Sequence, residues 1–111
     1  MEHNPIGAHM KRWLLTALAG AQRDGATDLV MEPTPGGTVF RYMGHRSPPS
    51  PAFEWPVVVS ELAGLAGARD AVYPREGIIY VAYSGVRLRW QFKMASQDSE
   101  CTLHNLGNDT I

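Results

Sequence analysis

Cysteine, lysine and long apolar runs are all scarce in this sequence of 111 residues. The single cysteine, Cys101, excludes a disulfide framework within the chain, and a reducing compartment is its simplest setting. The longest helical apolar run, Trp13 to Ala21, falls far short of the roughly 20 residues that a membrane span requires. The sequence therefore predicts a cytoplasmic protein without membrane insertion.

The net charge of the chain is also close to zero. Ten lysines and arginines stand against 11 aspartates and glutamates, which gives a formal net charge of −1. At the level of the whole chain, this balance disfavours nucleic acid and anionic membranes as partners. Any function that depends on charge must come from a local cluster.

The chain has the size of one small domain. We expect it to extend from Met10 to Leu106, with a tag or disordered leader over residues 1–9 and a tail over residues 107–111. The stretch from Gly7 to Met10 reads like a cloning scar, which favours Met10 as the natural start, and the N-terminus lacks the features of a signal peptide.

Hydrophobic periodicity predicts two helices. The first extends from Met10 to Ala21 and stops at Asp24-Gly25, and the second begins at Pro56 and reaches Arg69. Turn signals and β-prone stretches predict about five strands, at residues 27–32, 38–43, 78–83, 86–94 and 101–106.

The connections between these elements also carry signals. Two prolines and two glycines between the first two strands predict a hairpin with a longer loop, and the proline-rich stretch His45 to Phe53 predicts an exposed loop. Ser84-Gly85 predicts a two-residue hairpin turn. This order favours an α+β fold in which a small antiparallel sheet of about five strands has two helices on one side.

The sequence lacks the motifs of most classes of enzyme. There is no P-loop and no dinucleotide fingerprint, so no cofactor is expected. The four histidines show no zinc-ligand spacing, so no metal is expected. Cys101 and His104 lie three positions apart on an expected strand, and therefore on opposite faces, which favours a buried packing thiol. We predict a protein that is not an enzyme.

Three carboxylates, Asp28, Glu32 and Glu76, offer the remaining acid–base chemistry. Nothing in the sequence fixes their separation, and solvated or turn-capping roles account for them better than catalysis does.

A row of cations is the one positive feature. Arg87, Arg89 and Lys93 share one face of an expected strand, and Arg41 lies on the other hairpin, so these cations would converge on a flat surface and contact a phosphate or an anionic partner. A plain solvated sheet face is the alternative interpretation. The intervening stripe is expected to be core: Val86, Leu88, Trp90, Phe92 and Met94.

Four short blocks resemble signatures of the motor ATPases of type II secretion and type IV pilus assembly, the GspE/PilB family. The block at residues 26–33 resembles Ala-Ser-Asp-Ile-His-Ile-Glu-Pro, and the block at residues 39–44 resembles Val-Arg-x-Arg-x-Asp-Gly. Residues 73–78 resemble Leu-Pro-Gln-Asp-Gly-Arg, and residues 86–89 resemble Val-Asp-Leu-Arg. The positions that match the family's structural signature are Asp28, Glu32, Pro33, Gly44, Pro74 and Gly77.

The resemblance implies a PAS-like, N2-type domain of the kind that precedes the motor domain in these ATPases. It also implies that Arg41 and Arg89 face nucleotide held by a neighbouring motor domain. Three family positions differ here, because Val30 replaces His, while Met43 and Arg87 each replace Asp. The motor domain itself is absent, which leaves open a fragment of a longer ATPase or a free-standing relative.

These observations predict a protein-interaction module that docks on a secretion or pilus motor ATPase or an assembly protein. The alternative is a stand-alone binder of nucleotide or short single-stranded nucleic acid, with Arg41, Arg87 and Arg89 on phosphate and Tyr42 or Tyr80 stacking on a base. An exposed sheet edge would also permit a homodimer.

Overall fold

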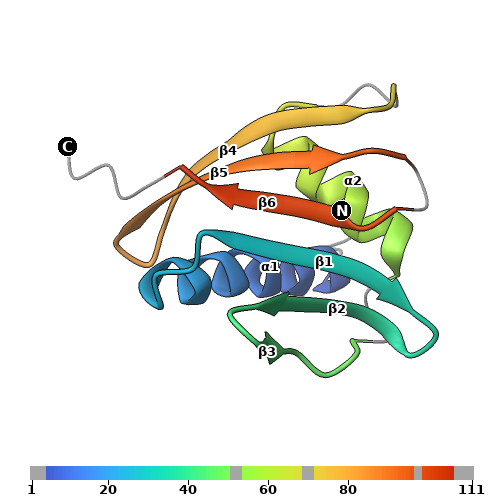
Figure 1. Cartoon of the computed structure of the whole chain (residues 1–111), viewed down its shortest axis with the longest axis horizontal. Helices are drawn as coiled ribbons and strands as arrows, with labels where there is room; N and C mark the ends of the chain where they lie inside the picture. Colours follow the sequence, from blue (N-terminus) through green and yellow to red (C-terminus); the bar gives the residue numbers. More distant parts are fainter. Residues whose placement is uncertain (1–4, 51–53, 69–71, 97–98, 107–111) are drawn as a thin grey trace.

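The computed structural model describes residues 5–50, 54–68, 72–96 and 99–106. These residues form one antiparallel sheet in the order β3-β2-β1-β6-β5-β4, and both helices lie behind it in Figure 1. The predicted α+β fold is therefore confirmed, with six strands in place of five. The elements are α1 (Pro5–Arg23), β1 (Asp28–Thr34), β2 (Gly37–Tyr42), β3 (His45–Arg46), α2 (Trp55–Leu65), β4 (Arg75–Tyr83), β5 (Val86–Met94) and β6 (Cys101–Asn105).

The sixth strand corrects the prediction of a loop from His45 onward. Met43 and Gly44 have φ angles of 49° and 81°, the left-handed values that a tight hairpin turn requires at both central positions. The chain therefore reverses at once, and His45 and Arg46 pair with the end of β2. Residues 51–53 of the expected loop lie outside the described residues.

The connection between β1 and β2 is shorter than the predicted longer loop. β1 continues through Pro33 to Thr34, so only Pro35 and Gly36 remain between the strands. The Thr34 hydroxyl donates a 2.6 Å hydrogen bond to the Gly37 carbonyl and closes the turn. The sequence prediction was wrong because proline was taken to end the strand.

Both helices differ from their predicted bounds. The first begins at Pro5, five residues before Met10, and ends at Arg23. The second ends at Leu65, and its predicted end at Arg69 lies outside the described residues. No helix of the described residues is both long enough and apolar enough to cross a membrane.

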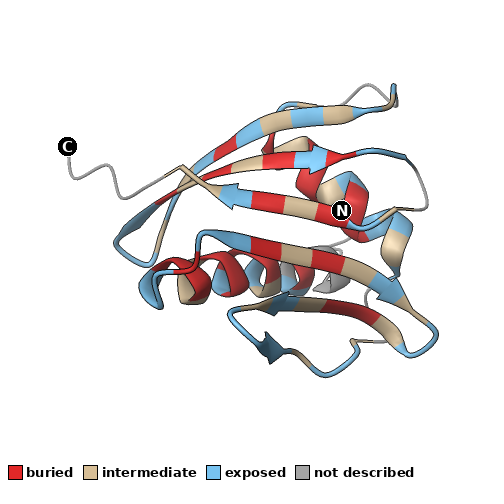
Figure 2. Cartoon of the chain, in the orientation of Figure 1, coloured by how far each residue is buried: buried red, intermediate tan, exposed pale blue. Residues whose placement is uncertain are grey.

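The core lies between the helices and the sheet. In Figure 2, buried positions follow one side of α1 and alternate mainly with intermediate ones along the central strands. The predicted apolar stripe on β5 is buried from Leu88 to Met94, whereas Val86 at the hairpin end is 41% exposed. The largest fully buried side chains are Trp90, Phe92, Met10, Leu14, Leu18, Leu29, Met31, Leu62, Ile79, Leu88, Met94 and Leu103.

Strand alternation gives the sheet a second side, turned away from the helices, which we call the open face. Its cross-strand neighbours follow from the register, in which Glu76 pairs with Lys93, Lys93 with Thr102, Thr102 with Val30 and Val30 with Arg41. The other open-face positions follow at steps of two residues along each strand. They are Asp28, Glu32, Val39, Ile78, Tyr80, Ala82, Arg87, Arg89, Gln91 and His104.

Gly77 is where β4 touches the end of α2. A Cβ atom at this position would come within 2.3 Å of the Ala66 carbonyl oxygen and 3.0 Å of its Cβ. Ala66 is the C-cap of α2, and the nearest atom is its backbone carbonyl oxygen, so no flexible side chain can move aside to make room. Only glycine allows this close approach between β4 and the end of α2.

We therefore predict that Gly77→Ala destabilises the fold by about 1–3 kcal/mol through overpacking. The control is Gly64→Ala in α2, where a Cβ would meet nothing within 4 Å. That change should stabilise the protein by up to about 1 kcal/mol, because alanine favours helix over glycine. Urea unfolding of both variants measures the difference, and equal stabilities would contradict the contact.

Candidate functional site

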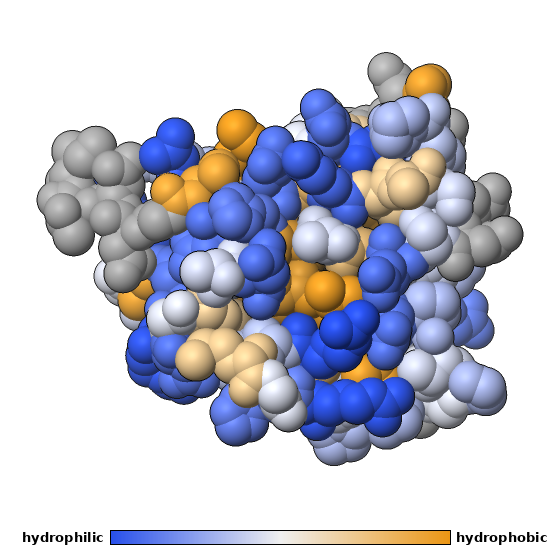
Figure 3. All heavy atoms as spheres, viewed as in Figure 1, coloured by the Kyte–Doolittle hydropathy of each residue, from blue (hydrophilic) through white to orange (hydrophobic). Residues whose placement is uncertain are grey.

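The cations of β5 form the candidate site. Arg87, Arg89 and Lys93 alternate with the buried Leu88, Trp90 and Phe92, so all three lie on the open face, as predicted. Arg87 and Arg89 are separated by about 7 Å along the strand, and Lys93 lies about 13 Å beyond Arg89, with Gln91 between them. Figure 3 looks at this face and shows hydrophilic residues surrounding a smaller apolar centre.

Arg41 shares the open face but does not converge with this row. It is separated from Lys93 by β1 and β6, three strand spacings that amount to about 14 Å. Its Nη2 lies 3.1 Å from Glu100 Oε2, and its Nε lies 3.7 Å from Glu32 Oε1. The expected convergence of Arg41 with the β5 cations is therefore wrong, because carboxylates of the same chain hold its guanidinium.

The two ends of the β5 row have different electrostatic surroundings. At the Lys93 end, the register partner is Glu76, and a hollow of about 380 Å³ is lined by charges of both signs, including Arg75 and Glu100. At the other end, Arg87 lies opposite Ala82 and Arg89 opposite Tyr80. The most basic part of the row is therefore the Arg87–Arg89 end.

His104 and Asp28 form an ion-pair candidate at the middle of the open face. The His104 Nδ1 lies 2.9 Å from Asp28 Oδ1, and both side chains are about half exposed, at 51% and 53%. This hydrogen bond, with a smaller contribution from the Thr27 hydroxyl, holds the pKa of Asp28 below its ordinary value of 3.8 against the opposing effect of burial. Sequence reasoning missed this pair because its partners are 76 positions apart.

Cys101 and His104 do not form a pair of nucleophile and base. Cys101 is fully buried on the helix side of β6, and burial raises the pKa of its thiol. His104 is exposed on the opposite face, as predicted from strand alternation. Among the described residues, no three His, Cys, Asp or Glu side chains gather closely enough to hold a metal ion.

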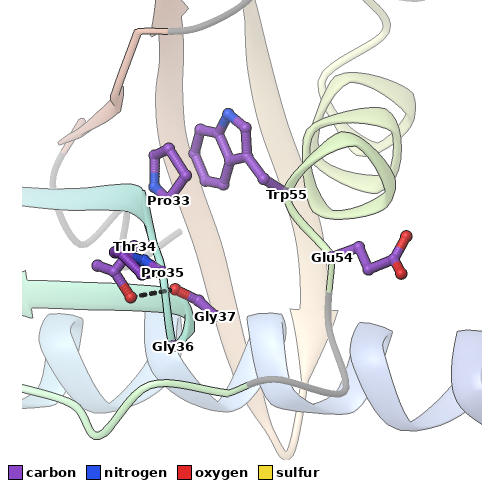
Figure 4. Close-up of a pocket in the computed structure, with 7 residues that line it drawn as sticks. All are labelled: Pro33, Thr34, Pro35, Gly36, Gly37, Glu54 and Trp55. Carbon is purple, nitrogen blue, oxygen red and sulfur yellow. Dashed lines mark hydrogen bonds between the residues drawn. The ribbon is translucent and has the colours of Figure 1, made fainter.

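A second hollow, of about 270 Å³, lies where the β1–β2 turn meets the start of α2. Figure 4 shows the Trp55 ring beside Pro33, with the Glu54 carboxylate directed away from both. Trp55 Nε1 is buried and has no hydrogen-bond acceptor among the described residues. The lining is mainly apolar, and its one charged side chain points outward, so it presents no converging polar groups for a ligand.

The signature residues occupy mostly structural positions. Asp28 makes the hydrogen bond to His104, Glu32 makes an ion pair with Arg41, and Pro33 lines the smaller hollow. Gly44 provides the turn before β3, Gly77 provides the contact with α2, and Pro74 follows a cis peptide bond just before β4.

A scan against models of protein families finds no match, and a search of the curated proteins finds none either. The kinship with secretion and pilus ATPases therefore rests on the four sequence blocks and stays a prediction.

The Asp28–His104 pair predicts a specific pH dependence. Because the folded-state pKa of Asp28 lies below 3.8, the stabilisation is present above that pH and is lost as the pH falls through the folded-state value. Asp28→Asn should cost less than about 1 kcal/mol at pH 7, since the pair is exposed. The difference from the unaltered protein should shrink in acid.

Urea unfolding at neutral and acidic pH measures this effect. The control is Glu54→Gln, because Glu54 is an exposed carboxylate without a side-chain capping bond. A stability difference for Asp28→Asn that does not change with pH would show that the pair contributes no charge-dependent stabilisation.

Proposed function

We propose that this chain is a non-enzymatic docking module of a type II secretion or type IV pilus ATPase system. It binds a motor ATPase or an assembly protein in the cytoplasm and presents arginines to it from the open face of its sheet. The sequence motivation is the ordered series of four blocks that resemble the domain ahead of the motor in those ATPases.

One structural observation carries the proposal: Arg87 and Arg89 lie two residues apart on a sheet face that neither helix covers. Guanidinium groups bind carboxylates and phosphates through paired hydrogen bonds, so two neighbouring arginines favour an anionic partner surface. The exposed aromatic ring of Tyr80 lies opposite Arg89 on the neighbouring strand and adds apolar contact area. Arginine and tyrosine are enriched at protein interfaces.

The chemistry of the site favours binding over catalysis. The only thiol is buried with a raised pKa and lies on the other side of the sheet from His104. A nucleophile needs a base within hydrogen-bond reach, and this pair does not meet that requirement.

The expected role of Arg41 requires the loss of its own ion pairs. To reach a partner's phosphate, its side chain must leave Glu100 and Glu32. An exposed pair of this kind contributes at most about 1 kcal/mol, so a partner is able to recruit Arg41, but the free protein does not hold it ready.

For the alternative, a binder of nucleotide or single-stranded nucleic acid, fewer of the expected binding residues lie on the open face. Tyr42 lies on the helix side of β2, where its hydroxyl donates a 2.8 Å hydrogen bond to Asp24 Oδ2. It is therefore unable to stack on a base at the open face. Only Tyr80 remains as an aromatic platform beside Arg89.

The test is direct binding of the full chain to the purified secretion or pilus motor ATPase of the same organism, at about 20 micromolar of each protein. We expect a complex in sedimentation velocity, and the double variant Arg87→Gln/Arg89→Gln should bind at least about tenfold more weakly. The matched control is Lys11→Gln/Arg12→Gln, which removes two exposed positive charges from α1.

Two results would contradict the proposal. One is the absence of a complex with any motor or assembly protein of these systems. The other is equal loss of binding in both double variants, which would indicate an effect of total charge without an interface. Binding of a labelled oligonucleotide that collapses between about 50 and 200 mM salt would favour the nucleic-acid alternative.

A further inference from the structure

The outer edge of β4 is the longest unpaired strand edge among the described residues. β4 ends the strand order, and it pairs on one side only, with β5. At the opposite end of the sheet, β3 has just two residues, whereas β4 has nine. In Figure 1, β4 forms the rim of the sheet along its whole length.

Over most of its length this edge lacks the features that usually prevent strand pairing between molecules, and its two charged residues, Arg75 and Glu76, are the first two of the strand. Proteins protect such edges with proline, bulges, short strands or charged side chains. β4 contains no proline, and its register with β5 is continuous over nine pairs, without a bulge. From Gly77 to Tyr83 it carries no charged residue.

The large exposed side chains in the middle of the edge are apolar, whereas the charged Glu76 is exposed near its start. Ile78 and Tyr80 both point to the open face and are 50% and 57% exposed. Two large apolar side chains at adjacent open-face positions of an unprotected edge indicate a surface that is covered by a partner strand.

The sequence of β4 is complementary to itself in antiparallel orientation. If Ile79 of one copy lies opposite Ile79 of another, Ile78 of each copy faces Tyr80 of the other, and Glu76 faces Ala82. Pairs between aromatic and β-branched side chains are among the favourable cross-strand contacts. The two Glu76 side chains are then about 20 Å apart along the strand direction, so no like charges oppose each other.

We propose that two copies of this chain associate through antiparallel pairing of their β4 edges in this register. The two six-stranded sheets become one continuous sheet across a two-fold axis. Because directly opposite residues of an antiparallel pair point to the same face, both sets of helices lie on one side and both open faces on the other. This inference goes beyond the docking function and does not depend on it.

The small area of the β4–β4 contact limits the affinity of the dimer. One strand pair with two Ile–Tyr contacts covers less area than a standard stable interface, so the dimer belongs to the weak, concentration-dependent class. We expect a dissociation constant on the order of ten micromolar.

The test is sedimentation equilibrium of the full chain over a concentration range from about 1 to 300 micromolar. The unaltered protein should shift from monomer to dimer, and Ile78→Lys should weaken association at least tenfold, because it places two like charges at the edge. Ile78 is exposed, so the folded monomer tolerates this change. The matched control is Val57→Lys on α2, at a position that is 47% exposed.

The register has its own test in disulfide trapping. Ile78→Cys and Tyr80→Cys are prepared as separate variants, mixed and oxidised. Directly opposite Cβ atoms lie about 4.5–5.5 Å apart and diagonal ones farther, so the mixture should cross-link more efficiently than either variant alone. Native Cys101 is buried and does not compete.

Three outcomes would overturn the proposal. The protein stays monomeric at the highest concentration, Ile78→Lys and Val57→Lys weaken association equally, or the cysteine mixture cross-links no better than the single variants. Monomer throughout would leave β4 as an edge for a different chain.

Discussion

The one-sided burial of β5 is the constraint on which the rest of the structure depends. Its apolar residues from Leu88 to Met94 lie against the helices, and the alternation of a strand then forces the intervening arginines and lysine onto the other face. A shift of one residue in pairing would bury the cations and expose Trp90. The cation row is therefore a direct consequence of core packing.

That dependence explains which predictions from sequence succeeded. The β5 strand, the Ser84-Gly85 turn and the opposite faces of Cys101 and His104 all follow from local alternation, and the structure agrees with them. The predicted α+β arrangement also holds, because the order of helices and strands leaves few ways to cover one sheet face.

The features that sequence reasoning missed depend on contacts between distant segments. Arg41 was expected to join the β5 cations, but its position on the sheet is set by the insertion of β6 beside β1, which no local pattern reveals. The same pairing brings Asp28 to His104. The short β3 was missed for a different reason, since Met43 gave no sign that a non-glycine residue would adopt a left-handed turn conformation.

The pairing of β1 with β6 also determines which residues surround the buried thiol of Cys101. Cys101 lies opposite Met31 on one neighbouring strand and Met94 on the other, so it sits where the first and last parts of the chain meet. Because its side chain lies in the core between the sheet and the helices, a thiol reagent reaches the sulfur only when this core opens. The rate of Cys101 modification is therefore an internal measure of how often the core opens around β6.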